Sequence, residues 1–302
     1  MNQTFHTNRI IVDQSMTQLT AANDASEPKK LKILMLHGNS HTQLPDENCL
    51  TTFIGYTQSG PLFRAKTRSL EKLLIKFLKP VLPTFTYPTA PVKLHPADIP
   101  GFDVDAAEGS EPDAWGWWKR ETGGDKYIGL EEGLDRIGNA IRETGGIDAV
   151  IGFSQGAAAA AMVASLLQPG RAASFSTEES GSFAFPKSWE DLVALHPDGL
   201  RFAVSYSGFL TPNKLYEGFY KPKISCPTLH FIGSLDSVVE ESRSLALVEA
   251  CHDAKTVFHP GGHFVPVGKE MGGVLVGFIK ECTEEKIEEK EAEGFEEMDM
   301  PF

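Results

Sequence analysis

The sequence lacks the features that mark zinc modules, disulfide scaffolds, membrane proteins and nucleic-acid binders. Its 302 residues include four cysteines, none in a CxxC pair, so neither a zinc site nor a disulfide framework is indicated. The longest apolar run, residues 157–167, is shorter than the roughly 20 residues that a membrane-spanning helix needs. Lys and Arg form no basic stripe of the kind that binds nucleic acid. We therefore expect no metal, no cofactor, no nucleic-acid partner and no membrane span.

The two ends of the chain differ from its middle in composition. Residues 1–30 have neither the apolar core of a signal peptide nor the Arg-rich pattern of a transit peptide, so we expect a flexible extension and a cytoplasmic protein.

The net charge is −13, but residues 281–302 hold ten acidic residues against two lysines, a net of −8 that leaves −5 for the rest. Such a run is typical of a solvated helix end or a disordered segment, so we assign residues 283–302 to an acidic C-terminal tail.

Between these ends the chain alternates short β-type runs with helix-length amphipathic segments. With 41% hydrophobic and 23% charged residues, it can bury a sizeable core. Strands are predicted at six mostly apolar runs: 31–36, 84–87, 149–153, 201–206, 228–233 and 255–258. Apolar strands that alternate with helices favour a mostly parallel sheet with helices on both faces. We therefore predict one α/β domain over residues 31–282.

The parallel arrangement sorts the loops into two edges of the sheet. Ligands bind where the C-terminal ends of parallel strands meet, so the loops that follow strands, such as residues 37–60 and 88–126, belong to the functional edge. The Ser-rich segment 168–199 follows a helix and precedes a strand. We therefore predict that it is an insertion at the edge opposite the active site.

The segment Gly152-Phe153-Ser154-Gln155-Gly156 fits the pattern G-x-S-x-G, with an apolar strand before it and an alanine-rich helix after it. This pattern places a serine on a sharp, strained turn that closes only when the flanking glycine positions are small. Ser154 is therefore the candidate nucleophile. The backbone N–H of Gln155, at the start of the helix, is a candidate donor to an oxyanion. The five residues alone fit a turn without chemistry equally well.

A serine nucleophile needs a histidine base and an orienting carboxylate, which in this fold class follow it in the order serine, acid, histidine. Asp236 comes shortly after the run 228–233, and His263 comes shortly after the run 255–258. Both residues therefore belong to the functional edge. His259 lies at the end of a strand and is the less well placed alternative for the base.

The remaining site predictions concern the oxyanion hole and the acyl pocket. The first predicted strand is followed by His37-Gly38-Asn39, where Gly38 permits close approach and the N–H of Asn39 is the predicted second oxyanion donor. Apolar side chains from loops at the same edge indicate a mainly apolar acyl site: Trp115, Trp117, Trp118, Phe209, Leu210 and Phe264. For any single tryptophan, packing of its own loop is the commoner role.

Several blocks of the chain resemble a known family when they are taken together. These blocks are KILMLHGNS, YPTAP, AWGWW, GLEEGLDRI, AVIGFSQGAA, VSYSGF, HFIGSLDSVV and HPGGHFVP. In this order and spacing they resemble the serine hydrolases that include the ovarian-tumour-suppressor-candidate esterase, the yeast FSH enzymes and fungal polyketide-releasing thioesterases. The likeness covers about residues 32–280 and implies an α/β-hydrolase fold. It also implies a set of roles: Ser154 as nucleophile, Asp236 as acid, His263 as base, and the N–H groups of Asn39 and Gln155 as the oxyanion hole.

The expected function is a serine hydrolase that cleaves a carboxylic ester or thioester with an apolar acyl part through an acyl-enzyme. The expected partner is this small molecule, either free or presented by an acyl carrier protein during release of a secondary metabolite. Two alternatives stay open. One is a receptor that binds a small ligand on a hydrolase fold without catalysis, and the other is a peptidase.

Overall fold

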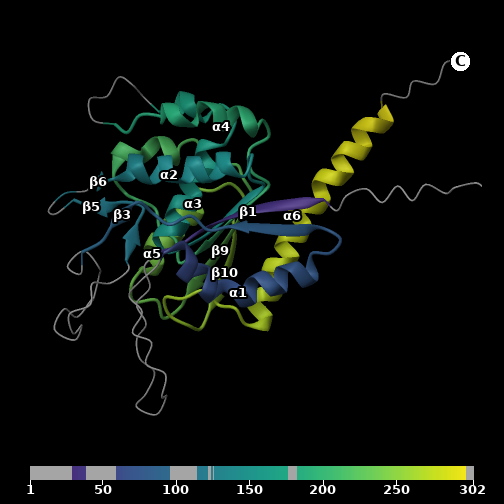
Figure 1. Ribbon diagram of the computed structural model, residues 1–302, viewed down its shortest axis with the longest axis horizontal. Coiled ribbons are helices and arrows are strands. Elements are labelled where there is room, and N and C mark those ends of the chain that lie inside the picture. Colours follow the sequence, from purple (N-terminus) through teal and green to yellow (C-terminus); the bar gives the residue numbers. More distant parts are fainter. Residues whose placement is uncertain are drawn as a thin grey trace, which may run out of the picture.

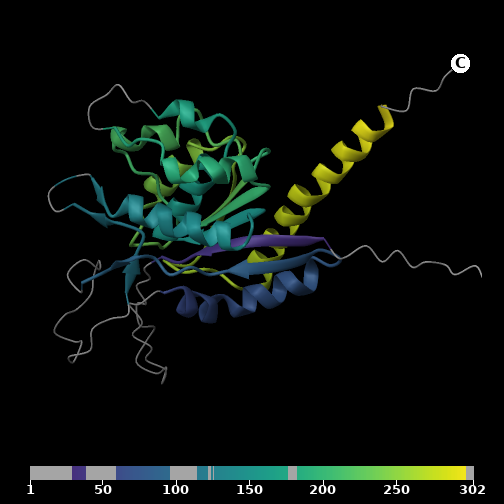
Figure 2. The same cartoon turned by 45° about the horizontal axis from the view of Figure 1, so that its top comes forward.

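A six-stranded parallel sheet forms the centre of the protein in the computed structural model, with the strand order β10-β9-β8-β7-β1-β2 (Figures 1 and 2). The structure describes residues 29–38, 59–95, 114–121, 124, 126–175 and 182–296, of which 285–296 are described by their backbone alone. The strands are β1 (Lys30–Leu36), β2 (Leu82–Thr86), β7 (Ala149–Phe153), β8 (Phe202–Tyr206), β9 (Thr228–Gly233) and β10 (Lys255–His259). All five pairings are parallel, which confirms the predicted α/β class and the six predicted strands.

Helices cover both faces of the sheet because the central strands bury side chains on both faces. Along β1, Ile33 and Met35 pack with α1 (Gly60–Phe77) and α6 (Lys269–Glu296). The alternate residues Leu34 and Leu36 pack on the other face. That face is covered by α2 (Leu130–Glu143), α3 (Gln155–Leu166) and α5 (Glu241–Glu249). The period of two along the strand thus divides the core into two layers.

The alanine run explains how close α3 lies to the sheet. Residues 156–166 of this helix are all buried, and residues 157–161 are all alanine. Alanine favours the helix and adds little volume, so the start of α3 lies directly behind β7.

The long connection between β2 and α2 forms two short antiparallel ribbons that were not predicted from the sequence. One pairs β3 (Val92–Lys93) with β4 (Trp115–Gly116), and the other pairs β5 (Lys119–Arg120) with β6 (Tyr127–Ile128). Each strand is two residues long, too short for any periodicity to show in the sequence. Together the ribbons hold the tryptophan-rich segment in a defined place.

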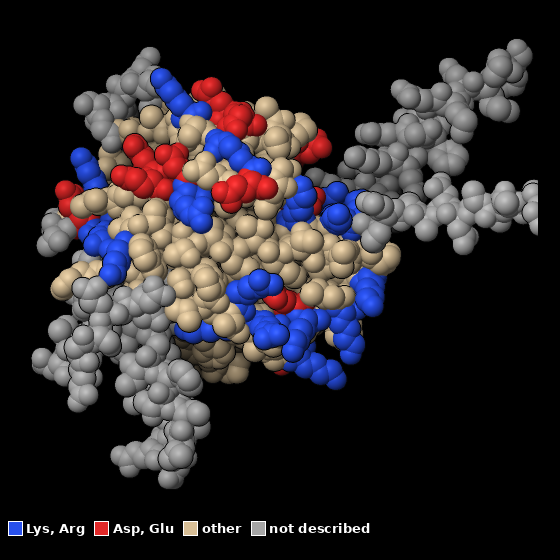
Figure 3. All heavy atoms as spheres, in the orientation of Figure 1, with Lys and Arg blue, Asp and Glu red and all other residues tan. Residues whose placement is uncertain are grey.

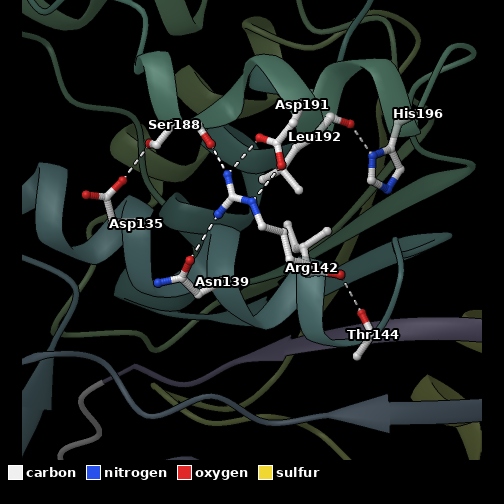
Figure 4. Close-up of polar contacts among 9 residues, drawn as sticks. Asp135, Asn139, Arg142, Thr144, Ser188, Asp191, Leu192 and His196 are labelled. Atoms are coloured by element: carbon white, nitrogen blue, oxygen red, sulfur yellow. Dashed lines mark hydrogen bonds and ion pairs between the residues drawn. The ribbon is translucent and has the colours of Figure 1, made fainter.

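The insertion 168–199 packs on the outer side of α2 through η3 (Lys187–Trp189) and α4 (Glu190–Leu195). Arg142 of α2 donates both Nε and Nη2 to the Asp191 carboxylate, at 2.7 and 2.8 Å, and also bonds the Ser188 carbonyl (Figure 4). His196 accepts the Ile147 N–H at 3.0 Å. A further part of the insertion reaches the segment that follows β8, because the Phe183 N–H donates to the Leu215 carbonyl at 2.8 Å.

A group of basic side chains and the start of the acidic tail lie on neighbouring helices. Figure 3 shows basic side chains gathered over α1, whose exposed positions include Arg64, Lys66, Arg68, Lys72 and Lys76. Helix α6 packs beside α1 and then projects away from the body through residue 296 (Figure 2). The first part of the predicted acidic tail is therefore helical. Apart from residues 29 and 30, the predicted N-terminal extension lies outside the described residues.

Candidate active site

Ser154 lies on the turn between β7 and α3 and has φ 54° and ψ −119°, a conformation that L residues rarely adopt. Its N–H donates to the Tyr206 carbonyl at 2.8 Å, which ties the turn to β8. A Cβ on Gly156 would lie 2.2 Å from the Leu36 carbonyl oxygen, and one on Gly152 would lie 2.1 Å from the Gly156 carbonyl oxygen. Both flanking positions therefore admit glycine alone, which is the steric reason for the G-x-S-x-G spacing.

The structure brings Ser154, His263 and Asp236 together in one chain of hydrogen bonds. His263 Nε2 lies 2.9 Å from Ser154 Oγ, across 109 residues of sequence. His263 Nδ1 lies 2.8 Å from Asp236 Oδ2. The side chains of His263 and Asp236 are almost completely buried. Asp236 follows β9 and His263 follows β10, so the sheet delivers all three residues to the same edge.

The environment of Asp236 keeps its carboxyl group ionised. Burial alone would raise the pKa, but the hydrogen bond from His263 and the N–H of Val239 outweigh it and hold the pKa of Asp236 at about 2. Asp236 Oδ1 accepts the N–H groups of Val238 and Val239, both at 2.9 Å. Oδ2 therefore remains for His263 Nδ1–H, which leaves Nε2 as the acceptor for the Ser154 hydroxyl.

Backbone groups beside Ser154 could stabilise a negatively charged oxygen. Gln155 is the first residue of α3, so its N–H has no carbonyl partner four residues earlier in the helix. On the other side, a Cβ on Gly38 would lie 2.2 Å from the Phe153 carbonyl oxygen and 2.7 Å from Ser154 Cβ. The backbone after β1 is thus in direct contact with the serine turn. Asn39, the predicted second donor, lies outside the described residues.

Comparison with known proteins places this chain in a family. Residues 47–273 match the family described as Serine hydrolase (FSH1). The chain belongs to this family. The predicted resemblance is therefore confirmed.

Three relatives show how far the likeness extends. The chain is 33% identical over 244 residues to the dihydrofolate reductase of Schizosaccharomyces pombe, a match that covers 79% of this chain and 44% of that relative. It is 29% identical over 237 residues to esterase OVCA2 of Danio rerio, covering 75% of this chain and 93% of the relative. This chain thus spans less than half the length of the first relative and nearly all of the second.

Among solved structures, acyl-protein thioesterase 2 of Zea mays is similar to this chain, with a TM-score of 0.52 and 18% identity over 85% of this chain and 95% of that one. At this identity the likeness concerns the fold, and it confirms the predicted α/β-hydrolase architecture.

In this FSH1-family chain, two of the three tryptophans predicted to bind substrate are packed inward. Trp117 is 1% exposed and Trp118 is 3% exposed. The Trp117 indole N–H donates to the His37 carbonyl at 2.8 Å. Trp118 stacks on Tyr127 with ring centroids 4.9 Å apart, and Tyr127 stacks in the same way on Tyr216. These two tryptophans support the edge of the site, whereas Trp115 is only partly buried.

The other predicted substrate-binding residues keep exposed surface. Phe209 and Leu210 are partly buried, and the Arg243 guanidinium lies 4.4 Å from the centre of the Phe209 ring. Phe264 is 49% exposed and meets the ring of His259 edge-on. His259, the alternative base, accepts the Gly261 N–H at 3.3 Å, and burial lowers its pKa. It takes no part in the hydrogen bonds that join the Ser154 and His263 side chains.

The sequence did not predict the hydrogen bonds of the Gln155 side-chain amide or of the Tyr216 hydroxyl. The Gln155 amide bonds the backbone of Trp117 and Trp118, and the Tyr216 hydroxyl accepts the Tyr127 N–H at 2.6 Å. No local pattern signals these contacts, because the partners lie 37, 38 and 89 residues apart.

Within the described ranges, no three His, Cys, Asp or Glu side chains are grouped as they would be to hold a metal ion. No helix of that part is both long and apolar enough to cross a membrane.

Proposed function

We propose that this protein is a serine hydrolase that cleaves a carboxylic ester or thioester with an apolar acyl group. The observation that carries the proposal is the hydrogen-bonded chain from Asp236 through His263 to Ser154, on a strained turn at the start of α3. Membership of the FSH1 family and the similarity to an esterase support the same reaction class.

In the proposed reaction each group of this arrangement has one role. His263 Nε2 takes the proton of the Ser154 hydroxyl as Oγ attacks the substrate carbonyl carbon. Asp236 stabilises the imidazolium that forms, and the Gln155 N–H donates to the developing oxyanion. The intermediate expels the alcohol or thiol, which receives the proton from His263, and leaves an acyl group on Ser154. Water then gives its proton to His263 as it attacks the acyl-enzyme, and the acid leaves with Ser154 restored.

The apolar acyl preference rests on the predicted pocket side chains that are not fully buried. Trp115, Phe209, Leu210 and Phe264 come from segments that follow strands and retain accessible surface. A buried apolar chain of several carbons would gain about 0.8 kcal/mol for each methylene that they cover. Release of an acyl or polyketide chain from a carrier protein is the narrower form of the proposal.

A fluorophosphonate probe tests the chemistry directly. It should label the wild type and fail to label Ser154→Ala. Ser165→Ala is a matched control, because Ser165 is a fully buried serine of the same helix at the end distant from Ser154. This control should be labelled like the wild type. Folded wild type that resists labelling would contradict the proposal and favour the receptor alternative.

A panel of aryl esters and coenzyme A thioesters of increasing chain length then measures the substrate class. We expect kcat/KM to rise with acyl chain length in the esters. Hydrolysis of carrier-bound acyl thioesters would support the narrower proposal, and its absence beside active ester hydrolysis would refute it. A peptide library provides the test for a peptidase.

A further inference from the structure

The side-chain amide of Gln155 makes two hydrogen bonds to one short backbone segment. Its Oε1 accepts the Trp117 N–H at 2.9 Å, and its Nε2 donates to the Trp118 carbonyl at 2.8 Å. The two partners differ in kind, one a donor and one an acceptor, so they fix the orientation of the amide. Gln155 follows the candidate nucleophile directly. The serine turn is therefore attached to a segment that comes from a different part of the chain.

That segment is itself held firmly. A Cβ on Gly133 of α2 would lie 2.1 Å from the Trp117 carbonyl oxygen, so the Trp117 backbone rests directly on α2. The Trp118 ring is stacked on Tyr127, and both tryptophan side chains are buried. The Gln155 amide is thus anchored to a rigid part of the fold rather than to an exposed loop.

The same segment also holds the backbone on the other side of Ser154. The Trp117 indole N–H donates to the His37 carbonyl at 2.8 Å. His37 Nε2 in turn accepts the Ala90 N–H at 3.0 Å, and His37 is fully buried. A Cβ on Gly156 would lie 2.4 Å from the His37 carbonyl oxygen, so this carbonyl lies between the indole and the first turn of α3. Residues 37 and 38 therefore have little freedom to move away from Ser154.

We propose that the Gln155 side chain is a positioning residue for the oxyanion site. Through Trp117 it links the first turn of α3, which carries the Gln155 N–H, to the backbone after β1, which lies against Ser154. Stabilisation of an oxyanion depends on donors that are already placed where the negative charge develops. Loss of the link would let the two backbone segments separate and would weaken transition-state binding more than substrate binding. This inference rests on the proposed hydrolase function.

Gln155→Met tests the link, because methionine has a similar length, keeps the backbone N–H and removes both side-chain hydrogen bonds. We expect kcat to fall by about 10- to 100-fold, less than or similar to the loss of a whole oxyanion donor. KM should change by less than about threefold, since ground-state contacts remain. The rate of fluorophosphonate labelling should fall by the same factor as kcat. Active-site titration corrects both rates for any misfolded protein.

Trp117→Phe removes the second link while it keeps an aromatic ring. Trp189→Phe is the matched control: Trp189 is a fully buried tryptophan between α2 and α4, and its indole N–H has no hydrogen-bond partner within the described residues. We expect Trp117→Phe to lower kcat and Trp189→Phe to leave it unchanged. The double variant Gln155→Met/Trp117→Phe should lose little more than the more impaired single variant, because both changes break one network.

Gln155→Glu supplies a readout that simple packing would not affect. The introduced carboxyl group can donate to the Trp118 carbonyl when protonated, but it repels that carbonyl when ionised. The ratio of variant to wild-type kcat should therefore rise as the pH falls. This variant also tests the proposal if Gln155→Met fails to fold.

Three outcomes would overturn the inference. Gln155→Met could retain kcat within about twofold of the wild type, a difference too small for a positioning role. The losses in the double variant could multiply as for independent sites, or the Gln155→Glu ratio could stay flat with pH. Wild type that neither reacts with the probe nor cleaves any ester would instead refute the hydrolase function itself.

Discussion

Replacement of Asp236 by asparagine changes one atom of the proposed triad and tests how the other two residues depend on it. Asp236 accepts two backbone N–H groups through Oδ1 and His263 Nδ1 through Oδ2. The asparagine oxygen can keep the backbone bonds, so its NH2 group must face His263. Because NH2 cannot accept a proton donor, Nδ1 becomes the acceptor and Nε2 carries the proton. His263 then has no lone pair for the Ser154 hydroxyl.

The Asp236→Asn variant should change kcat and the free energy of unfolding by different amounts. The wrong tautomer should lower kcat by about 10³- to 10⁴-fold, equivalent to about 4 to 5 kcal/mol of transition-state stabilisation. The effect on folding is smaller. The pKa of Asp236 is held at about 2 instead of 3.8, which corresponds to about 2 kcal/mol of stability at neutral pH. The variant retains the backbone hydrogen bonds, so its unfolding free energy should fall by no more than about this amount.

The pH dependence of stability gives an independent check on the same carboxylate. A lowered pKa means that the unfolded chain binds the proton first as the pH falls. The contribution of Asp236 is therefore complete above about pH 4 and is lost as the pH falls through about 2. Urea unfolding should show a stability difference between wild type and Asp236→Asn at neutral pH that vanishes near pH 2.

The assay is hydrolysis of an aryl ester, with active sites counted by titration. Asp148→Asn is the control, because Asp148 accepts the Lys32 N–H and pairs with Arg201, among contacts separate from those of the candidate triad. It should lower stability without lowering kcat per active site. A folded Asp236→Asn variant that keeps more than about a tenth of the wild-type kcat would refute the assigned role of the carboxylate.

Four further changes test the backbone and a buried histidine. Gly156→Ala should lower the unfolding free energy by about 3 kcal/mol or more in urea titrations, because its Cβ would collide with the Leu36 carbonyl. Gly273→Ala, where a Cβ meets nothing within 4 Å, should instead stabilise α6 by about 0.5 to 1 kcal/mol. Ser154→Gly should be inactive yet more stable to heat than Ser154→Ala by about 1 kcal/mol, since glycine relieves the backbone strain; equal melting temperatures would contradict this. Burial lowers the pKa of His230 to about 4, so the wild type should lose about 3 kcal/mol of stability between pH 6.5 and 4, and His230→Gln should abolish that part of the acid sensitivity.

The arrangement of the candidate triad could be predicted from local patterns. Apolar runs of strand length specify where the sheet is, because a strand buried on both faces needs apolar residues throughout. Asp236 and His263 each follow such a run, and parallel strands end at one edge, so their proximity to Ser154 follows from topology. The glycine spacing around Ser154 is also local, since it reflects the space that a tight turn requires.

The orientation of the tryptophans and the hydrogen bonds of Gln155 and Phe183 depend on contacts between segments that are distant in the sequence. The sequence could not show that Trp117 and Trp118 point inward, because an exposed pocket and a packed loop have the same composition. Nor could it show that Gln155 bonds their backbone, or that Phe183 of the insertion reaches Leu215.

There is a physical reason why the sheet and the serine turn could be predicted from the sequence while the contacts of Gln155 and Trp117 could not. Strand and turn formation depend on the steric and hydrophobic character of residues next to each other in the chain, so pattern alone was sufficient for the sheet, the serine turn and the order of Asp236 and His263. The orientation of Gln155 and Trp117 depends on which buried donors and acceptors remain unpaired once separate segments have packed. Only the tertiary structure decides those partners.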